Sequence, residues 1–205
     1  MPVNITSKEE VYDNEFWDNI YSKDAVPWSD APANFLKQFV KHLEPKYKIL
    51  DLGCGRGRNS IYLNKLGFDV TGLDLSKEAI DQAKKIDSTC KFHQFDLMEQ
   101  EWPRGFDAII DFGFYHFIPN DKRQVYIENL LRSLNSNGIY CQQSGRNDLE
   151  HTYNRIPGEY IPPELDKAEI LLTKYFDTIS LEEITLPPHG QWKKYPCWNL
   201  IAKKK

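Results

Sequence analysis

The stretch ILDLGCGRGRNS, residues 49–60, constrains the fold of this chain more than any other. A short apolar run leads into glycines at positions 53, 55 and 57, and a helical pattern begins directly after them. Because glycine has no Cβ, it adopts positive φ angles and lets a ligand approach the backbone closely. A strand that turns this tightly into a helix predicts an α/β fold with a ligand site at the turn.

Strand-like and helix-like patterns alternate along the chain, which is typical of a parallel sheet with helices on its faces. Strands are expected at residues 47–52, 68–73, 91–95, 106–112 and 139–143, and helices at 33–43, 58–66, 76–86, 121–134 and, after a proline-rich loop, up to 175. Gly67 and Asn137-Gly138 are expected to end two of these helices. Two last strands, near 178–184 and 196–202, are joined by so short a loop that they must be antiparallel. The prediction is an α/β fold: a doubly wound, mostly parallel seven-stranded sheet with a C-terminal antiparallel hairpin.

Length, charge and cysteine spacing limit the class of protein. The 205 residues suffice for one domain, expected to span residues 1–205. A net charge of −4 gives no general attraction to nucleic acid or an anionic membrane, and the terminal Lys203-Lys204-Lys205 is expected to be a solvated tail. Cys54, Cys90, Cys141 and Cys197 lack the spacing of a zinc site or a disulfide framework. With no apolar run of ~20 residues and a polar N-terminus, we expect a cytoplasmic protein with reduced thiols.

The glycine spacing argues against a dinucleotide cofactor. The dinucleotide fingerprint is G-x-G-x-x-G, in which the last glycine lets the helix pack on the strand. Counted from Gly53, that last position is Arg58. NAD is therefore the weakest of the cofactor hypotheses.

Three aspartates stand at the ends of successive expected strands. Asp51 lies two residues before the first glycine, where a carboxylate suits a ligand that presents a cation. Asp74 ends the second strand, where it can accept hydrogen bonds from both hydroxyls of a ribose. Asp96 ends the third, in reach of an adenine amino group. Carboxylates that only cap strand ends are the alternative, but a cation, a ribose and an adenine together describe S-adenosylmethionine.

These motifs resemble those of the class I S-adenosylmethionine-dependent methyltransferases, over about residues 48–143. DLGCGRG resembles the first motif of that family, LDLS the second, FDL the third, and FDAIIDFGFYHF the strand that lies under the methyl group. The resemblance implies S-adenosyl-L-methionine as the cofactor and no metal. The implied cofactor-binding residues are Asp51, Gly53, Cys54, Gly55, Gly57, Asn59, Asp74, Leu75, Asp96, Leu97, Asp111, Phe112 and Trp28.

Two further stretches narrow the resemblance. GRNSIYLNKLGFDV, and a chain that ends soon after a strand in LIAKKK, resemble the tellurite-resistance methyltransferases. FWDNIYSKDAVPW resembles both these and the thiopurine methyltransferases. In such relatives the N-terminal segment folds over the cofactor, which implies a lid or arm at residues 1–32 lined by Trp17, Tyr21 and Trp28. Simple packing of an N-terminal arm is the alternative for each of the three.

The methyl acceptor is expected to lie just beyond the fourth strand. Methyl transfer is an in-line displacement, so positioning in a dry site can supply roughly 7–11 kcal/mol of the acceleration. A thiol or an oxyanion needs no base, whereas a phenol or an alcohol would. His116 is the candidate catalytic residue, as that base or to orient the acceptor, and His151 and His189 are more remote candidates. The alternative is that His116 only packs at the start of a helix.

Two pictures of the acceptor stay open. The N/D-P-P-Y signature of enzymes that methylate a base or a glutamine is absent, and Asp111-Phe112-Gly113-Phe114 stands in its place. Aromatic residues favour a small, flat or apolar acceptor: Phe112, Phe114, Tyr115, Tyr153, Tyr160 and Trp192. Cationic residues would instead hold an anion: Arg146, Arg155, Lys193 and Lys194.

The predicted function is transfer of a methyl group from S-adenosylmethionine to a small-molecule sulfur, oxygen or metalloid-oxyanion nucleophile. An aminopropyl transferase is one alternative, although it would want a second acidic cluster near the fourth strand, where only Asp111 stands. A regulatory protein that binds the cofactor without turnover is the other. No nucleic-acid or membrane partner is expected.

Overall fold

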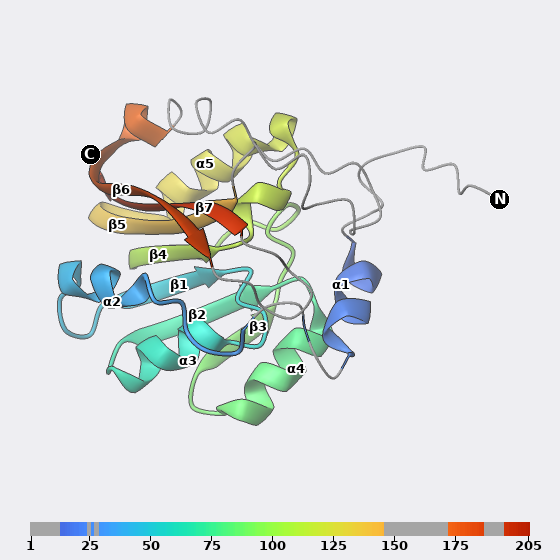
Figure 1. The fold of residues 1–205 in the computed structure, drawn as a ribbon. Coiled ribbons are helices and arrows are strands. Elements are labelled where there is room, and N and C mark those ends of the chain that lie inside the picture. Colours follow the sequence, from blue (N-terminus) through green and yellow to red (C-terminus); the bar gives the residue numbers. More distant parts are fainter. Residues whose placement is uncertain (1–12, 24–25, 27–28, 146–171, 187–194) are drawn as a thin grey trace.

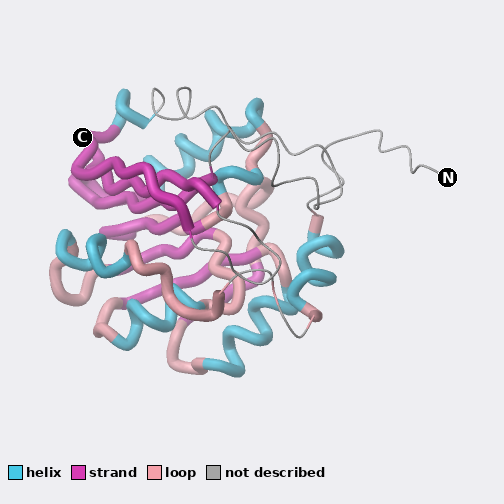
Figure 2. Tube along the Cα trace, in the orientation of Figure 1, coloured by secondary structure: helices cyan, strands magenta, loops and turns pink. Residues whose placement is uncertain are grey.

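The computed structural model describes residues 13–23, 26, 29–145, 172–186 and 195–205. A seven-stranded sheet forms its centre, with the strand order β3-β2-β1-β4-β5-β7-β6 (Figures 1 and 2). The strands are β1 Lys48–Leu52, β2 Asp69–Asp74, β3 Lys91–Gln94, β4 Phe106–Phe112, β5 Leu134–Gly145, β6 Phe176–Leu186 and β7 Tyr195–Lys204. The first five are parallel, and β7 lies antiparallel between β5 and β6. The predicted sheet, including its closing antiparallel pair, is confirmed.

Helices cover both faces of this sheet. α2 (Leu36–Phe39), α3 (Arg58–Lys65) and α4 (Lys77–Ile86) pack on one face, and α5 (Arg123–Ser133) packs on the other (Figure 1). α1 (Asn14–Tyr21) packs against α4, on the side towards which β1 points (Figure 1). Within the described parts of the chain, no helix combines the length and the apolar character needed to cross a membrane.

The central strands supply both halves of the core. In β1, Leu50 and Leu52 pack in the same cluster as the residues of α5, whereas Ile49 packs with α3 and α4 on the opposite face. Successive side chains of a strand point to opposite faces, so a strand covered on both faces reads as a continuous apolar run. FDAIIDF is such a run, and β4 begins and ends where the sequence pattern predicts.

Two predicted helices have different bounds in the structure. The helix expected at 33–43 is a four-residue α2 followed by a 3₁₀ turn, η2 (Val40–His42), and no side chain caps the start of α2. The helix expected to stop at Asn137-Gly138 ends at Ser133, because Leu134 already has an extended backbone and pairs with Phe106 of β4. The left-handed Asn137, with φ 60°, lies in the irregular part of β5 and not at a helix end.

The terminal lysines belong to the fold. Lys204 Nζ donates to Leu131 O and Leu134 O, at 2.6 and 2.7 Å, where α5 ends. Lys205 N donates to Tyr175 O at 3.0 Å. The expectation of a solvated tail is therefore wrong for Lys204, because β7 runs beside β5 and brings this side chain to the end of α5.

Candidate active site

The glycine-rich turn between β1 and α3 has the backbone that its sequence predicts. Gly53, Gly55 and Gly57 have φ angles of 63°, 56° and 79°, which residues with a Cβ rarely adopt. Cys54 N donates to Leu73 O at 2.9 Å and joins the turn to the end of β2. Burial raises the pKa of the Cys54 thiol, so the thiol stays protonated. The turn is a fixed stretch of backbone at the carboxyl edge of the sheet.

Asp51 is buried next to this turn, at the end of β1. Its side chain is 1% exposed, and Ser60 Oγ of α3 donates to its Oδ2 at 2.6 Å. Burial raises the pKa of Asp51 from 3.8 to about 7, against the lowering effect of the Ser60 hydrogen bond. A cationic ligand next to this buried carboxyl group would favour its ionised form and lower its pKa.

Asp74 joins the glycine turn to the start of α4. Gly55 N donates to its Oδ2 at 2.7 Å, and Ser76 N donates to its Oδ1 at 2.9 Å. Burial raises the pKa of Asp74 to about 6, although both backbone hydrogen bonds lower it. Each carboxylate oxygen has two lone pairs, so these bonds leave capacity for two hydroxyls of a ligand.

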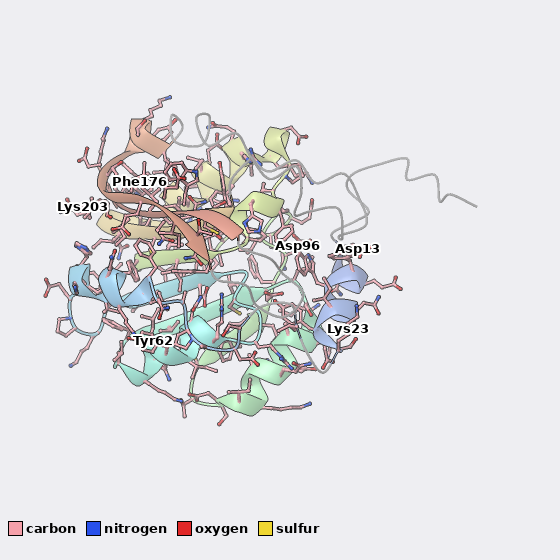
Figure 3. All side chains as sticks on the ribbon, viewed as in Figure 1. Asp13, Lys23, Tyr62, Asp96, Phe176 and Lys203 are labelled. Carbon is pink, nitrogen blue, oxygen red and sulfur yellow. The ribbon has the colours of Figure 1, made fainter. Side chains whose placement is uncertain are left out.

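Asp96 follows β3, on the side of the molecule where α1 lies (Figure 3). Its Oδ1 accepts hydrogen bonds from Met98 N and Glu99 N, at 2.8 and 3.2 Å, so it caps the turn after the strand. Leu97 is buried beside it, and the half-buried Leu75 directly follows Asp74. The capping role that was the alternative for the aspartates is thus present at Asp96.

Asp111 ends β4 inside a closed hydrogen-bond network. Phe114 N and Tyr115 N donate to its Oδ1 at 2.9 and 3.2 Å, and Tyr126 Oη donates to its Oδ2 at 2.7 Å. Tyr126 Oη also bonds Tyr140 Oη at 2.8 Å. Asp111 has 0% exposure, and the hydrogen bonds that it accepts from Phe114 N and Tyr115 N fix the turn after β4. Its predicted contact with the cofactor stays a prediction.

His116 lies in the 3₁₀ turn η3 (Tyr115–Phe117) that follows β4. Its side chain is 8% exposed, and Gly145 N at the end of β5 faces its Nδ1 at 3.5 Å. Burial and the charge of Arg123 lower the pKa of His116 from 6.5 to about 3. An imidazole that accepts at Nδ1 carries its proton on Nε2, so the ring is a neutral hydrogen-bond donor. Of the two roles predicted for His116, orientation of the acceptor suits this state better than proton abstraction.

Helix α1 lies over the glycine turn (Figure 1). A Cβ built on Gly55 would be 2.6 Å from Tyr21 Oη, so the tyrosine hydroxyl rests directly against the turn. Asp18 Oδ1 accepts from Ser76 Oγ at 2.5 Å and from Glu78 N at 3.1 Å, at the start of α4. α1 therefore contacts both the glycine turn and the start of α4, which the hydrogen bonds of Asp74 join.

Trp17 lies one turn before Tyr21 on the same face of α1, and it meets the turn that carries His116. The ring of Trp17 packs edge-on against the ring of Phe117 in η3, with centroids 5.0 Å apart. α1 thus contacts both the β1–β2 side and the β4 side of the carboxyl edge.

A second set of contacts fixes the chain just after α1. Arg58 Nη1 donates to Ser29 O and Ala31 O, at 2.8 and 3.2 Å. Asn59, which was predicted to bind the cofactor, is 4% exposed, and its Oδ1 accepts from Ala33 N at 3.0 Å. Arg58 stands where a dinucleotide site has its last glycine, and here it holds the N-terminal arm.

The residues that hold α1 in place carry no sequence motif. Gln82 of α4 accepts from Arg56 Nε and donates to Tyr21 O at 2.8 Å. The partners of Asp18 and Tyr21 in α4 lie 58 to 61 residues away along the chain. The one available signal was the aromatic pattern of the segment FWDNIY, which singled out Trp17 and Tyr21.

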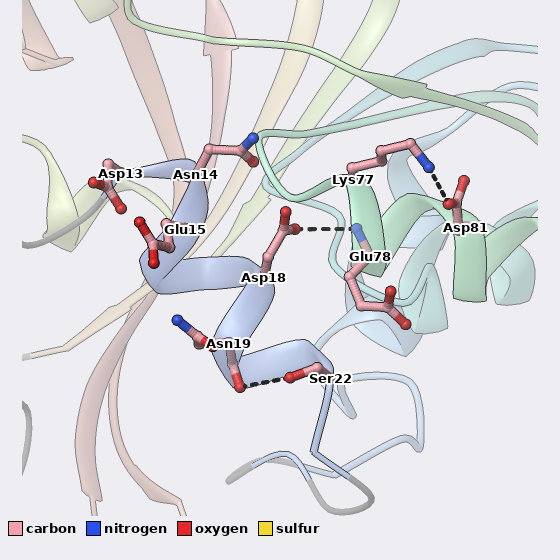
Figure 4. A pocket seen from close by; sticks show the side chains of 9 residues that line it. All are labelled: Asp13, Asn14, Glu15, Asp18, Asn19, Ser22, Lys77, Glu78 and Asp81. Atoms are coloured by element: carbon pink, nitrogen blue, oxygen red, sulfur yellow. Dashed lines mark hydrogen bonds and ion pairs between the residues drawn. The ribbon is translucent and has the colours of Figure 1, made fainter.

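A surface cleft of about 590 Å³ opens between α1 and α4 (Figure 4). It is lined by Asp13, Asn14, Glu15, Asp18, Asn19, Ser22, Lys77, Glu78 and Asp81. Neither the glycine turn nor the Asp51 and Asp74 carboxyl groups belong to that lining, so the candidate site is the turn beneath α1 and not this cleft. Among the described residues, no three His, Cys, Asp or Glu side chains are grouped so that they could hold a metal ion.

The structure brings together the predicted residues of the first two motifs. Asp51, Gly55, Gly57 and Asp74 are buried and Gly53 is half-buried; Gly55 bonds Asp74 and lies against Tyr21. Asp96 and the half-buried Phe112 lie at the ends of the flanking strands. Predicted residues that lie outside the described part of the chain are Trp28, Arg146, His151, Tyr153, Arg155, Tyr160, His189, Trp192, Lys193 and Lys194.

Comparison with known proteins places this arrangement among methyltransferases. Residues 49–138 match the family model described as a methyltransferase domain. An uncharacterized methyltransferase of Schizosaccharomyces pombe is 35% identical over 115 residues, which cover 54% of this chain and 79% of that protein. The eEF1A lysine and N-terminal methyltransferase of Mus musculus is 26% identical over 149 residues, which cover 68% of this chain and 21% of that protein.

TehB of Haemophilus influenzae, a probable S-adenosyl-L-methionine-dependent methyltransferase, is similar in both sequence and structure. It is 30% identical over 95 residues, 44% of this chain and 33% of that protein. Its crystal structure superposes with a TM-score of 0.71 at 21% identity, covering 94% of this chain and 67% of that chain. The superposition shows a shared fold.

Proposed function

Because this chain belongs to the class I S-adenosylmethionine-dependent methyltransferases, we propose that it methylates a small-molecule acceptor with a sulfur, oxygen or metalloid-oxyanion nucleophile. The observation that carries this proposal is the buried pair Asp51 and Asp74 beside the positive-φ glycines, with Tyr21 of α1 against Gly55. Family membership supplies the reaction and the cofactor. The geometry supports the assignment of roles to residues.

Cofactor binding is assigned to the glycine turn and its two carboxyl groups. Asp74 keeps a lone pair on each oxygen for the two ribose hydroxyls, and Asp51 offers a buried charge to the cationic part of the cofactor. Both carboxyl groups have raised pKa values, so each gains from a ligand that favours its ionised form. These residues fit the groups of S-adenosylmethionine. Asp96 is assigned to the adenine, with Leu75, Leu97 and Phe112 beside it.

Methyl transfer requires the protein mainly to align S-adenosylmethionine with the acceptor and to exclude water. S-adenosylmethionine supplies the methyl group: a lone pair of the acceptor forms the new bond to carbon while the carbon–sulfur bond breaks and leaves its electron pair on sulfur. Trp17 and Tyr21 of α1 exclude water from the carboxyl edge of the sheet. His116 is assigned to orient the acceptor as a neutral imidazole. An acceptor that already offers a lone pair, such as a thiolate or an oxyanion, needs no base.

The position of α1 favours a small acceptor. Its contacts run from Gly55 and Ser76 on one side to Phe117 on the other. With α1 in this place, the acceptor reaches the site beside the β4 and β5 ends. Only a molecule that fits under α1 or past it can do so.

A protein acceptor is the second candidate, favoured by the 26% identity to the eEF1A lysine and N-terminal methyltransferase. This chain spans 21% of that relative, so the relative's substrates are no more than a suggestion here. A lysine or an amino terminus must lose a proton before it attacks, which calls for a base. With a pKa of about 3, His116 is a poor one. The small acceptor therefore stays the preferred candidate.

Release of S-adenosylhomocysteine from purified protein and S-adenosylmethionine tests the proposal. The panel of acceptors comprises tellurite and selenite, aromatic thiols, phenols, catechols and carboxylates, with eEF1A as the protein acceptor. Turnover of one small-molecule class is expected, and turnover of eEF1A alone would overturn the proposal. Cofactor that binds without release of product in any reaction would support the regulatory alternative.

Asp74→Ala is the variant that tests the assignment of the cofactor site. Loss of two ribose hydrogen bonds should weaken cofactor binding by about 1–3 kcal/mol, or roughly tenfold to a hundredfold. Calorimetry with S-adenosylhomocysteine measures the change directly. An unchanged affinity would remove Asp74 from the site.

A further inference from the structure

Three polar side chains at the carboxyl ends of β4 and β5 are buried, each with a polar atom that has no partner among the described residues. Tyr115, Gln142 and Ser144 are 1%, 6% and 5% exposed. Tyr115 Oη, Gln142 Nε2 and Ser144 Oγ bond to none of the residues that the structure describes. An unpaired buried polar group costs about 1–3 kcal/mol, and roughly nine in ten such groups in native proteins are paired. Three of them near one edge of the sheet indicate a bound molecule as the missing partner.

Gln142 and Ser144 lie in β5, and Tyr115 lies in the turn η3 that follows the neighbouring strand β4. Side chains alternate along β5, so Gln142 and Ser144 face the same side as Tyr140, towards α5. Gln142 lies opposite Asp111 in the β4–β5 register, and Asp111 Oδ1 accepts from Tyr115 N. Ligands of open α/β sheets bind outside the carboxyl ends of the strands, which is where this group lies.

The carboxylate of Asp111 does not satisfy these side chains. The carboxylate of Asp111 already receives Phe114 N, Tyr115 N and Tyr126 Oη. His116 stands next to the group, since its Nδ1 faces Gly145 N directly after Ser144. These side chains therefore lie near the residue that is assigned to orient the acceptor.

All three side chains can donate a hydrogen bond. Gln142 Nε2 is a donor only, and the hydroxyls of Tyr115 and Ser144 can each donate. We name Tyr115, Gln142 and Ser144 the donor cluster. A neutral carbonyl oxygen offers two lone pairs, which is too few for three donors, whereas a carboxylate offers about four.

We propose that the donor cluster binds a carboxylate group of the methyl acceptor. This inference rests on the proposed methyl transfer and narrows its acceptor to an organic acid. The carboxylate is held by the donor cluster, while a separate sulfur or oxygen atom of the same molecule attacks the methyl group. That atom arrives as a thiolate or an oxyanion that has already released its proton to water, so no proton passes to the protein.

A pair of thiols that differ in one group tests the proposal. 3-Mercaptopropionate and 3-mercaptopropionamide carry the same nucleophile, but only the first has a carboxylate. Charge-assisted hydrogen bonds are about twice as strong as neutral ones, so we expect kcat/KM for the acid to exceed that for the amide by at least about tenfold. Calorimetric titration of both thiols into the protein loaded with S-adenosylhomocysteine should give the same preference without turnover.

Two variants and a matched control test whether the donor cluster causes the preference for the acid over the amide. Ser144→Ala and Gln142→Leu should each bring the acid-to-amide ratio towards one. Ser133→Ala is the control, because Ser133 Oγ is also buried and unpaired in the described structure but lies at the end of α5. Removal of an unpaired hydroxyl should leave the melting temperature of both serine variants close to the native value.

The outcomes separate the two proposals. Equal binding of acid and amide, or an equal ratio in Ser144→Ala, Gln142→Leu and native protein, would show that the donor cluster holds no carboxylate. Selective binding of the acid without release of S-adenosylhomocysteine would support the donor cluster while contradicting methyl transfer to this acid. Turnover of both thiols at the same rate would do the reverse.

Discussion

Asp51 has a pKa of about 7 in the folded chain, against 3.8 for an ordinary aspartate, because β1 and α3 exclude water from it. Between these two pH values the folded state keeps a proton that the unfolded state has lost. The contribution of Asp51 to the stability of the free protein therefore falls as pH rises from about 4 to 7. Asp51→Asn keeps an oxygen for Ser60 Oγ and carries no charge. We expect this variant to be more stable than the native chain at pH 8, by about 2–4 kcal/mol, and equal to it near pH 4.

Urea unfolding at pH 4, 6 and 8 measures this difference. Asp177→Asn is the control, because the Asp177 side chain is 75% exposed and its replacement should not change the pH profile. The same Asp51→Asn substitution should weaken binding of S-adenosylmethionine, since the cation loses its buried partner. Parallel pH profiles for Asp51→Asn and the native chain would contradict the raised pKa.

Gly55 has two separate reasons to lack a Cβ, and they can be measured apart. Its φ is 56°, and a Cβ would lie 2.6 Å from Tyr21 Oη. Gly67 has φ 93° but an open surrounding, so Gly67→Ala reports backbone strain alone. We expect unfolding free energies to fall by about 1 kcal/mol for Gly67→Ala and by about 2–3 kcal/mol for Gly55→Ala. Adding Tyr21→Phe should recover part of the second loss, and no recovery would mean that α1 does not press on the turn.

At the scale of secondary-structure elements, the end of α5 depends on the last strand of the sheet. The helix leaves carbonyl groups at its C-terminus without intrahelical partners, and a cation there also interacts favourably with the helix dipole. Lys204 Nζ donates hydrogen bonds to Leu131 O and Leu134 O, and it places a positive charge at this end of the helix. Lys204→Met keeps the apolar stem and should lower the unfolding free energy by about 1–2 kcal/mol.

The exposed Lys203 provides the comparison for this prediction. Lys203 neighbours Lys204 in β7, but its side chain is exposed and points to the other side of the strand. Lys203→Met should change the unfolding free energy by less than about 0.5 kcal/mol. Equal losses in both variants, measured by urea unfolding, would mean that the charge and not the capping geometry matters.

Elements defined by an apolar run between turn signals were predictable from the sequence, and elements defined by distant partners were not. β4 has the predicted bounds because FDAIIDF is buried on both faces. The end of α5 was mispredicted because Leu134 fits a helical pattern equally well, and only its pairing with Phe106 makes it extended. Lys204 looked like a solvated charge for the same reason: its partners lie 70 and 73 residues away.

The same distinction between local signals and distant partners applies to the residues of the candidate site. The glycine turn, Asp51 and Asp74 could be predicted, because their positions relative to a strand end are local features of the sequence. The contacts of Asp18, Gln82 and Ser60 could not, since each depends on how helices pack on the finished sheet. The donor cluster also escaped prediction, because an unpaired polar atom is defined only by what surrounds it.

At the scale of the whole molecule, α1 links the ends of β1 and β2 to the turn that follows β4. Asp18 bonds Ser76 Oγ and Glu78 N at the start of α4, Tyr21 rests on Gly55, and Trp17 packs on Phe117. Most side chains of α1 are exposed or half-buried, so this helix opens more easily than the core. A cofactor bound beneath α1 adds contacts that exist only when α1 is closed, so binding and closure should stabilise each other.

Asp18→Ala tests this coupling. The substitution raises the intrinsic helix propensity of α1 but removes its bonds to the start of α4, so any loss reflects docking and not helix formation. We expect S-adenosylhomocysteine to slow amide hydrogen exchange in residues 14–21 of the native chain, and Asp18→Ala to reduce that protection and weaken binding about threefold to tenfold. Glu15→Gln changes an exposed acid of the same helix and should behave as the native chain does. If exchange in α1 is equally slow with and without S-adenosylhomocysteine, α1 is a permanently packed part of the fold, and the site must then admit its cofactor past a fixed helix.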